Sequence, residues 1–121
     1  MKKTVSLKKN HLFRRLYSKG RSAVSPYMAV YFRRNGQREN RLGFTVSTKL
    51  GHAVVRNRVR RRLREIYRLN EDKLTSGVDL VVVARVRAVN AGYGQLERSF
   101  LQLCGRLGVL KRETGEKGGP V

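Results

Sequence analysis

The chain carries, from residue 56 to residue 68, the stretch Arg56-Asn57-Arg58-Val59-Arg60-Arg61-Arg62-Leu63-Arg64-Glu65-Ile66-Tyr67-Arg68. Seven of these thirteen residues are arginine, yet apolar residues recur at a regular spacing. On a helix they fall on one side, at the i, i+4, i+8, i+11, i+12 positions: Val55, Val59, Leu63, Ile66 and Tyr67. We therefore expect a helix from about Ala53 to Asn70 whose apolar side packs against a core.

The polar side chains of this helix point away from that core. They are Arg60, Arg61, Arg64, Arg68 and Asn57 opposite the apolar stripe, and Arg56, Arg58 and Arg62 on its flanks. Glu65 is the one acid in the stretch, so pairs such as Arg61-Glu65 or Glu65-Arg68 can neutralise only a small part of the charge. Charged helix faces are usually solvated surface, but like charges at i, i+4 each cost a few tenths of a kcal/mol. The pattern favours a nucleic-acid partner.

The composition of the whole chain agrees with this interpretation. Its 28 Lys and Arg against 8 Asp and Glu in 121 residues give a formal charge of +20. A body this basic binds phosphate backbones, and patterned apolar residues, 40% of the total, predict one globular domain rather than a disordered basic chain. We expect this domain at 1–110, followed by a disordered tail at 111–121. Without a secretory signal or membrane span, a cytoplasmic location is predicted.

Residues that could perform chemistry are few. Cys104 is the one cysteine and falls in an apolar pattern, so it is expected in the core. With His11 and His52 it makes no zinc-ligand set, and both histidines are interpreted as surface or phosphate-contacting residues. Among the eight acids only Glu71-Asp72 are adjacent, at a predicted helix end where solvated acids are ordinary. No nucleophile or phosphate-loop motif appears, so the residues argue against catalysis by the protein.

The remaining elements follow from period and turn signals. We expect a helix at His11 to Ser18, capped by Asn10 and ended by Gly20; strands at Tyr27 to Arg34 and Arg41 to Thr48, forming a hairpin through the Asn35-Gly36 turn; a buried central strand at Val78 to Arg85; and an amphipathic helix from about Asn90. Residues 1–9 are expected to be partly ordered at best.

Alternation divides the predicted hairpin into two faces. The core face carries Met28, Val30, Phe32, Leu42, Phe44 and Val46, and the other face carries Tyr27, Ala29, Tyr31, Arg33, Arg41, Gly43, Thr45 and Ser47. The second face suits an open platform for a single strand, although a solvated sheet face would look similar. Phe13 and Tyr17, surrounded by cations, are either core contacts or stacking groups for unpaired bases.

Several motifs, in this order, resemble the protein subunit of bacterial ribonuclease P. They are the helix with Phe13 and Tyr17, Lys19-Gly20-Arg21, the strand 42–47, the loop Lys49-Leu50-Gly51-His52-Ala53-Val54-Val55, and the arginine helix opened by Arg56-Asn57-Arg58. Together they span most of residues 7–110. The resemblance implies an α+β fold: a single-domain α-β-β-β-α-β-α two-layer sandwich, ribosomal protein S5 domain 2-like, with a left-handed βαβ crossover and an extra short strand near Arg21 to Val24.

The resemblance also implies a division of labour. A large RNA would catalyse, with Mg²⁺, the endonucleolytic removal of the 5′ leader from precursor tRNA, and the protein would be an accessory subunit with no cofactor of its own. Its partners would be ribonuclease P RNA and precursor tRNA, in a 1:1 ribonucleoprotein with monomeric protein and no membrane. A ribosomal or assembly protein, or a small metal-dependent nuclease, are the alternatives.

Two sets of site residues follow. The resemblance places Arg56, Asn57, Arg58, Arg60, Arg61, Arg62 and Arg64 against the RNA subunit, and charge adds Arg68 and Lys49. It places Phe13, Tyr17 and Tyr31 in a cleft for the leader, to which Arg14, Lys19, Arg21, Arg33, Thr45 and Ser47 are added. Thr48 stands where the family often has a lysine, so neither Thr48 nor His52 is given a role.

Overall fold

The computed structural model describes residues 4–111. Helix α2 spans Ala53–Asn70, as its apolar stripe predicts. Val59, Leu63, Ile66 and Tyr67 are buried, and Val55 at the start of the stripe is half-buried. The stripe therefore fixes the helix to the sheet and leaves its arginines on the outer surface.

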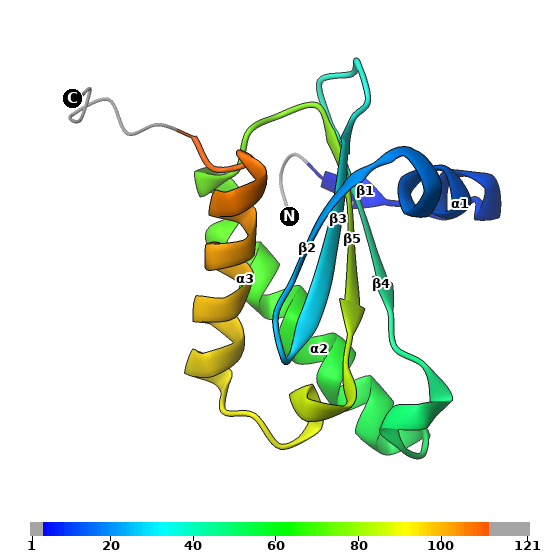
Figure 1. The fold of residues 1–121 in the computed structure, drawn as a ribbon, viewed down its shortest axis with the longest axis vertical. Coiled ribbons are helices and arrows are strands. Elements are labelled where there is room, and N and C mark those ends of the chain that lie inside the picture. The colour runs from blue at the N-terminus through cyan, green and yellow to red at the C-terminus, as the bar shows by residue number, and fades with distance from the viewer. Residues whose placement is uncertain (1–3, 112–121) are drawn as a thin grey trace.

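Five strands form one sheet in the order β1-β4-β5-β3-β2 (Figure 1). Their bounds are β1 Thr4–Ser6, β2 Arg21–Val24, β3 Met28–Arg34, β4 Asn40–Thr45 and β5 Val78–Ala84. Strand β5 is parallel to β4 and antiparallel to β3, while β1 is parallel to β4 and β2 is antiparallel to β3. Because α2 connects the parallel neighbours β4 and β5, the βαβ crossover implied by the resemblance is present.

The helices cover the two faces of the sheet unequally (Figure 1). Helix α2 and helix α3, at Tyr93–Leu107, share the main core with Met28, Val30, Phe32, Leu80 and Val82 of the sheet. Helix α1, at Asn10–Lys19, packs on the other face, where Leu16 meets Val81. The α+β class is confirmed, and the short strand predicted near residues 21–24 is β2.

The predicted hairpin of β3 and β4 is wrong. Asn35 and Gly36 do turn the chain, and Gly36 has φ +70°, but β5 lies between the two strands. Strand β5 is a nearly continuous apolar run that is buried along most of its length, and such a strand gains most at the centre of a sheet. A local turn signal shows that the chain reverses, and it does not show which strands pair.

Strand β1 was not predicted from the polar N-terminal residues. It is held by a long-range polar contact, because the Thr4 hydroxyl hydrogen-bonds with the Tyr67 hydroxyl at 2.6 Å and donates to the Glu71 carboxylate. Burial raises the pKa of Tyr67, and its hydrogen bonds with Thr4 and Asn40 oppose that rise. Glu71, expected to be a solvated acid, is buried instead.

Several element boundaries also differ by a few residues from the predicted ones. Lys9, not Asn10, is the residue before α1, and it makes no side-chain capping bond. Strand β4 ends at Thr45, and the Ser47 hydroxyl accepts a hydrogen bond from the Lys49 amide at the start of a short 3-10 helix, Thr48–Leu50. The predicted disordered tail lies outside the described residues except for Lys111, whose amide donates to the Lys73 carbonyl at 2.7 Å.

Candidate nucleic-acid interface

The outer face of α2 keeps nearly all its positive charge. Arg68 donates to both carboxylate oxygens of Glu65, at 2.9 and 2.6 Å, and this hydrogen bonding lowers the pKa of Glu65. No other α2 arginine forms an ion pair with a residue in 4–111. Of the two pairs that the sequence allowed, Glu65-Arg68 is the one formed, and six guanidinium groups remain without a neutralising acid in the described chain.

Three of those six donate to neutral oxygens that set their direction. Arg56 Nε donates to the Gly51 carbonyl at 3.2 Å, and Arg62 Nη1 donates to the Ala91 carbonyl at 3.2 Å. Arg60 Nη1 donates to Asn57 Oδ1 at 2.9 Å. These bonds orient each side chain and leave its charge in place. The others, Arg58, Arg61 and Arg64, are exposed.

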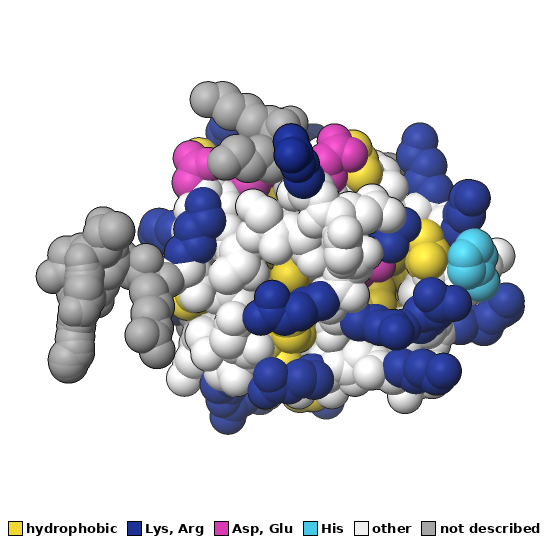
Figure 2. Space-filling model, turned by 90° about the horizontal axis from the view of Figure 1, so that it is seen from above, with side chains coloured by type: hydrophobic (Ala, Val, Ile, Leu, Met, Phe, Trp, Pro, Cys, Tyr) yellow, Lys and Arg dark blue, Asp and Glu magenta, His cyan; other side chains and the backbone are white. Residues whose placement is uncertain are grey.

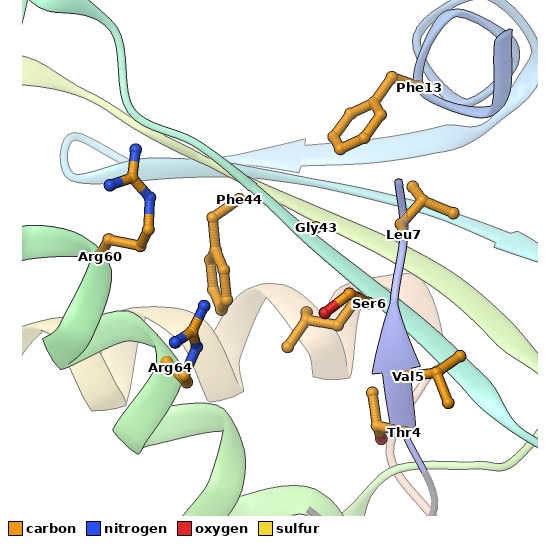
Figure 3. Close-up of a pocket in the computed structure, with 10 residues that line it drawn as sticks. Thr4, Val5, Ser6, Leu7, Phe13, Gly43, Phe44, Arg60 and Arg64 are labelled. Atoms are coloured by element: carbon orange, nitrogen blue, oxygen red, sulfur yellow. The ribbon is translucent and has the colours of Figure 1, made fainter. Parts of the chain in front are cut away.

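Arg60 and Arg64 line a pocket of about 230 Å³ at the edge of the sheet, which we call the β4-edge pocket (Figure 3). In this view the two arginines project from α2 beside Phe44 of β4, and Phe13 enters from α1. The remaining lining residues are Thr4, Val5, Ser6, Leu7, Leu42 and Gly43. Two guanidinium groups thus stand beside the ring of Phe44, a combination that suits a phosphate and its neighbouring base.

Three aromatic side chains form a cluster between α1 and the sheet. The ring centroids of Phe13 and Tyr17 are 6.5 Å apart, and those of Tyr17 and Tyr31 are 4.9 Å apart in an edge-to-face arrangement. The Tyr17 hydroxyl hydrogen-bonds with Thr45 Oγ1 at 2.8 Å. Tyr17 remains 41% exposed, so this cluster is both a core contact and an accessible aromatic surface, which combines the two interpretations left open by the sequence.

Helix α1 covers the middle of the sheet face that was expected to be an open platform. Tyr31, Val81 and Gly43 are neighbours across β3, β5 and β4, and α1 places Tyr17, Leu16 and Phe13 over them. The prediction of a fully open face is therefore wrong. The apolar side of α1 needed burial, and the small residue at position 43 allows the helix to approach.

Because α1 lies across the sheet face, it separates residues that the sequence assigned to a single leader cleft. Thr45 follows Gly43 by two residues on β4, at the end of the strand that leads to α2. Arg33 follows Tyr31 by two residues on β3, which runs in the opposite direction, so Arg33 lies on the other side of the covered row, level with Arg41. Arg33 instead joins Lys19, Arg21 and Arg34 around a second pocket of about 470 Å³, the β2-edge pocket, which Phe32, Leu107 and Gly108 complete. Arg14, Ser47 and Lys49 are exposed. The structure brings together Phe13, Tyr17, Tyr31 and Thr45, but not all nine residues.

Sequence reasoning missed two contributors to this region. Phe44, expected on the core face, is half-buried and lines the β4-edge pocket. Arg41 donates to both oxygens of the buried Asp79 at 2.7 and 2.8 Å. The signal for that pair was present, because a buried strand containing an aspartate needs a cationic partner.

The histidine, cysteine and acidic side chains singled out in the sequence can now be placed in the fold. Within 4–111, no group of three or more His, Cys, Asp or Glu side chains is placed to hold a metal ion. Cys104 is buried, as expected, and burial raises the pKa of its thiol to about 12. His52 precedes α2 and makes no side-chain capping bond. No described helix combines the length and apolar character needed to cross a membrane.

Basic side chains spread over the face in Figure 2, where most of the visible acidic ones lie along the upper edge. An α+β fold in which a helix on the sheet presents six arginines without an acidic partner in the described chain is typical of a small protein that binds a polyanion. Comparison with known proteins specifies this class further, because the family model described as Ribonuclease P matches residues 1–108. The chain belongs to the family of the bacterial ribonuclease P protein subunit.

The sequence is similar to those of individual relatives over nearly its whole length. The ribonuclease P protein component of Natranaerobius thermophilus is 40% identical over 114 residues, covering 94% of this chain and 99% of that protein. That of Alkaliphilus oremlandii is 41% identical over 110 residues, covering 91% and 96%.

Solved structures show the same fold. The RNase P protein of Staphylococcus aureus matches with a TM-score of 0.80 at 33% identity, covering 88% of this chain and 97% of that chain. The RNase P protein of Thermotoga maritima matches with a TM-score of 0.77 at 31% identity, covering 84% and 96%.

Proposed function

We propose that this protein binds ribonuclease P RNA through the outer face of α2 and assists that RNA in removing the 5′ leader from precursor tRNA. The observation that carries the proposal is the set of six α2 arginines without an acidic partner in the described chain. A rigid helix presents them at fixed spacing, so their mutual repulsion is relieved when phosphates of a folded RNA lie against them.

The leader of precursor tRNA would lie on the aromatic cluster and in the β4-edge pocket. Tyr17 and Tyr31 offer ring surfaces for unpaired bases, and Arg60 and Arg64 offer charge for the intervening phosphates. Stacking is tolerant of sequence because every base has an aromatic face. Such a site would hold leaders of differing sequence and would not engage mature tRNA, which lacks the leader.

The role of the protein in this scheme is electrostatic and geometric. Its arginines would neutralise phosphates that converge where RNA and substrate meet, and the pocket would position the leader relative to the RNA. The Mg²⁺ ions of the reaction would be held by the RNA, whose own phosphates supply oxygen ligands. Neutralising neighbouring phosphates would favour the compact complex in which those ions are bound.

A cleavage assay with three arms tests this function. Precursor tRNA is incubated with Mg²⁺ at physiological salt, with the protein alone, with a bacterial ribonuclease P RNA alone, or with both. We expect the pair to cleave faster than the RNA alone and the protein alone to be inactive. Cleavage by the protein alone would identify a nuclease, and no effect on the RNA would favour a ribosomal or assembly role.

An arginine variant connects the assay to the proposed face. Arg60→Gln with Arg64→Gln removes two charges from the β4-edge pocket, while Glu65→Gln with Arg68→Gln removes a pair that is already neutralised. The first variant should lose most of the stimulation by the protein, and the second should keep it. Equal behaviour of the two variants would contradict the assignment of the leader to this pocket.

A further inference from the structure

Four cationic side chains converge at the β2 edge of the sheet, away from α2. Lys19 ends α1, Arg21 begins β2, and Arg33 and Arg34 end β3. They surround the β2-edge pocket of about 470 Å³, whose remaining lining residues are Phe32, Leu107 and Gly108. No acidic residue lines this pocket, so nothing at its surface neutralises the cluster.

Arg33 contains a donor whose bonding is incomplete. Its Nη1 atom is buried and has no hydrogen-bond acceptor among the described residues. A buried charged donor without an acceptor carries a larger desolvation penalty than a neutral one does. A buried donor of this kind needs an acceptor from outside the described residues, and an anion can supply it.

The obvious local acceptor is already occupied. Asp79 is the cross-strand neighbour of Arg33, but its carboxylate receives both nitrogens of Arg41 and the amide of Asn35 at 3.0 Å. Arg21 is better accounted for, because its Nη1 donates to the Leu107 carbonyl at the end of α3, at 3.5 Å. Carbonyls at a helix C-terminus stabilise one cation, which leaves the charges of Lys19, Arg33 and Arg34 unexplained.

We propose that the β2-edge pocket is a second phosphate-binding site that takes a backbone segment of RNA separate from the one on α2. Strands β1 and β2 are the two edges of the sheet, so the β4-edge pocket and the β2-edge pocket lie on opposite sides of the protein. A phosphate oxygen would supply the acceptor for Arg33 after a small rotation of its guanidinium group. The protein then bridges two RNA segments instead of adhering to one.

This inference rests on the proposed RNA-binding function, and it reassigns Lys19, Arg21 and Arg33 from the leader cleft. The row covered by α1 separates Arg33 from Thr45 on the sheet. A leader that lies on the Thr45 side of this row would therefore have to cross α1 to reach the β2-edge pocket over this face of the sheet. The second segment belongs either to ribonuclease P RNA or to the body of the precursor tRNA.

Charge-removing variants of the full-length protein test the site. Lys19→Gln with Arg34→Gln changes two exposed side chains that form no described hydrogen bond, and Arg33→Gln separately removes the buried donor. The matched control is Lys73→Gln with Arg98→Gln, which removes the same charge from exposed positions outside both pockets. Thermal unfolding followed by circular dichroism restricts the comparison to folded variants.

Affinity is measured against salt concentration in two arms, one with ribonuclease P RNA alone and one with precursor tRNA bound to the preformed complex of RNA and protein. Each lost phosphate contact lowers the slope of log affinity against log salt by about 0.7 to 0.9. We expect the Lys19 and Arg34 double variant to lower this slope by about 1.4 to 1.8 in one of the two arms, and the control to leave it unchanged.

The arm that changes identifies the RNA. A change with ribonuclease P RNA assigns the site to the catalytic subunit, and a change only with precursor tRNA assigns it to the substrate. Slopes equal to the control in both arms, for the double variant and for Arg33→Gln, would overturn the inference. The proposed function would still stand in that case if the Arg60 and Arg64 double variant lowered the slope, and it would fail separately if that variant had no effect.

Discussion

Phe13 of α1 lies directly over Gly43 of β4, so closely that a Cβ atom at position 43 would come within 2.6 Å of Phe13 Cζ. Real Cβ atoms essentially never show such a contact, so any side chain at position 43 must displace the ring. The requirement for glycine here is one of space, because Gly43 is not among the residues with positive φ. This contact sets the depth at which α1 packs on the sheet and places Phe13 in the β4-edge pocket.

Gly43→Ala should therefore destabilise the protein by about 1 to 2 kcal/mol, the usual cost of overpacking. In a strand, alanine is otherwise favoured over glycine by roughly 0.5 to 1 kcal/mol. When Phe13→Ala has already removed the ring, Gly43→Ala should become neutral or stabilising. Urea unfolding of the two single variants and the double variant measures the coupling. Additive effects would show that the ring and the glycine do not interact.

Tyr31→Ala should weaken binding of precursor tRNA to the RNA and protein complex more than binding of mature tRNA. If one base of the leader stacks on the ring, the difference should be about 1 to 3 kcal/mol. Tyr27→Ala is the matched control, because Tyr27 packs against the core of α2 and α3 on the other face. Equal losses for the two tRNA forms would place Tyr31 in a purely structural role.

Arg64→Gln should lower the slope of log affinity against log salt for precursor tRNA bound to the complex of RNA and protein by about 0.7, the contribution of one phosphate contact of a single strand. The double variant of Glu65→Gln and Arg68→Gln should leave the slope nearly unchanged, because it removes a neutral pair on the same helix. Filter binding from low to high salt gives both slopes. A double variant that equals Arg64→Gln would show that Arg68 contacts phosphate despite its partner.

The sequence predicted α2 to the residue because every turn of that helix repeats the same apolar stripe. It failed for the pairing of β3 and β4, since the Asn35-Gly36 turn describes only local geometry while β5 is inserted from more than thirty residues later. Strand β1 had no local signal at all. Its position depends on Thr4 reaching Tyr67 and Glu71, a contact that exists only in the assembled fold.

One part of the candidate site could be predicted from the sequence, and the other part could not. The arginine face was predictable because it follows from the period of one helix. The single leader cleft was not, because whether α1 lies over or beside the sheet face depends on the fit between Phe13 and Gly43. Residues that alternate onto one face of a strand share that face, but a helix crossing the face can still separate them, as it separates Arg33 from Thr45.

Arg41→Met should destabilise the fold strongly, because it leaves the buried carboxylate of Asp79 with only the Asn35 amide as a described side-chain partner. Breaking a buried pair costs about 3 to 5 kcal/mol, and the 23% exposure of the Arg41 side chain reduces the expected loss to about 2 to 3 kcal/mol. Replacing both partners, with Arg41→Met and Asp79→Leu, should recover much of this loss. Chemical denaturation of both variants measures the difference, and equal destabilisation would contradict the interpretation.

Ionisation of the Cys104 thiol in the unfolded chain should lower the free energy of unfolding as the pH rises above about 9. Burial raises the pKa of its thiol to about 12 in the folded protein, from a reference value of 9.0. Because the folded state retains the proton after the unfolded state has lost it, the contribution of the thiol to stability is complete below the unfolded pKa. It then falls by up to about 1.4 kcal/mol per pH unit until the folded pKa is reached.

Cys104→Ala removes this titration and replaces no other ionisable side chain. The free energy of unfolding of the natural protein minus that of the variant should thus be constant from pH 6 to 8 and should decrease from pH 9 to 11. Denaturant titrations at each pH supply this difference. A difference that stays constant up to pH 11 would mean that the thiol ionises as readily in the folded chain as in the unfolded one, and that Cys104 is less well shielded from water than its burial indicates.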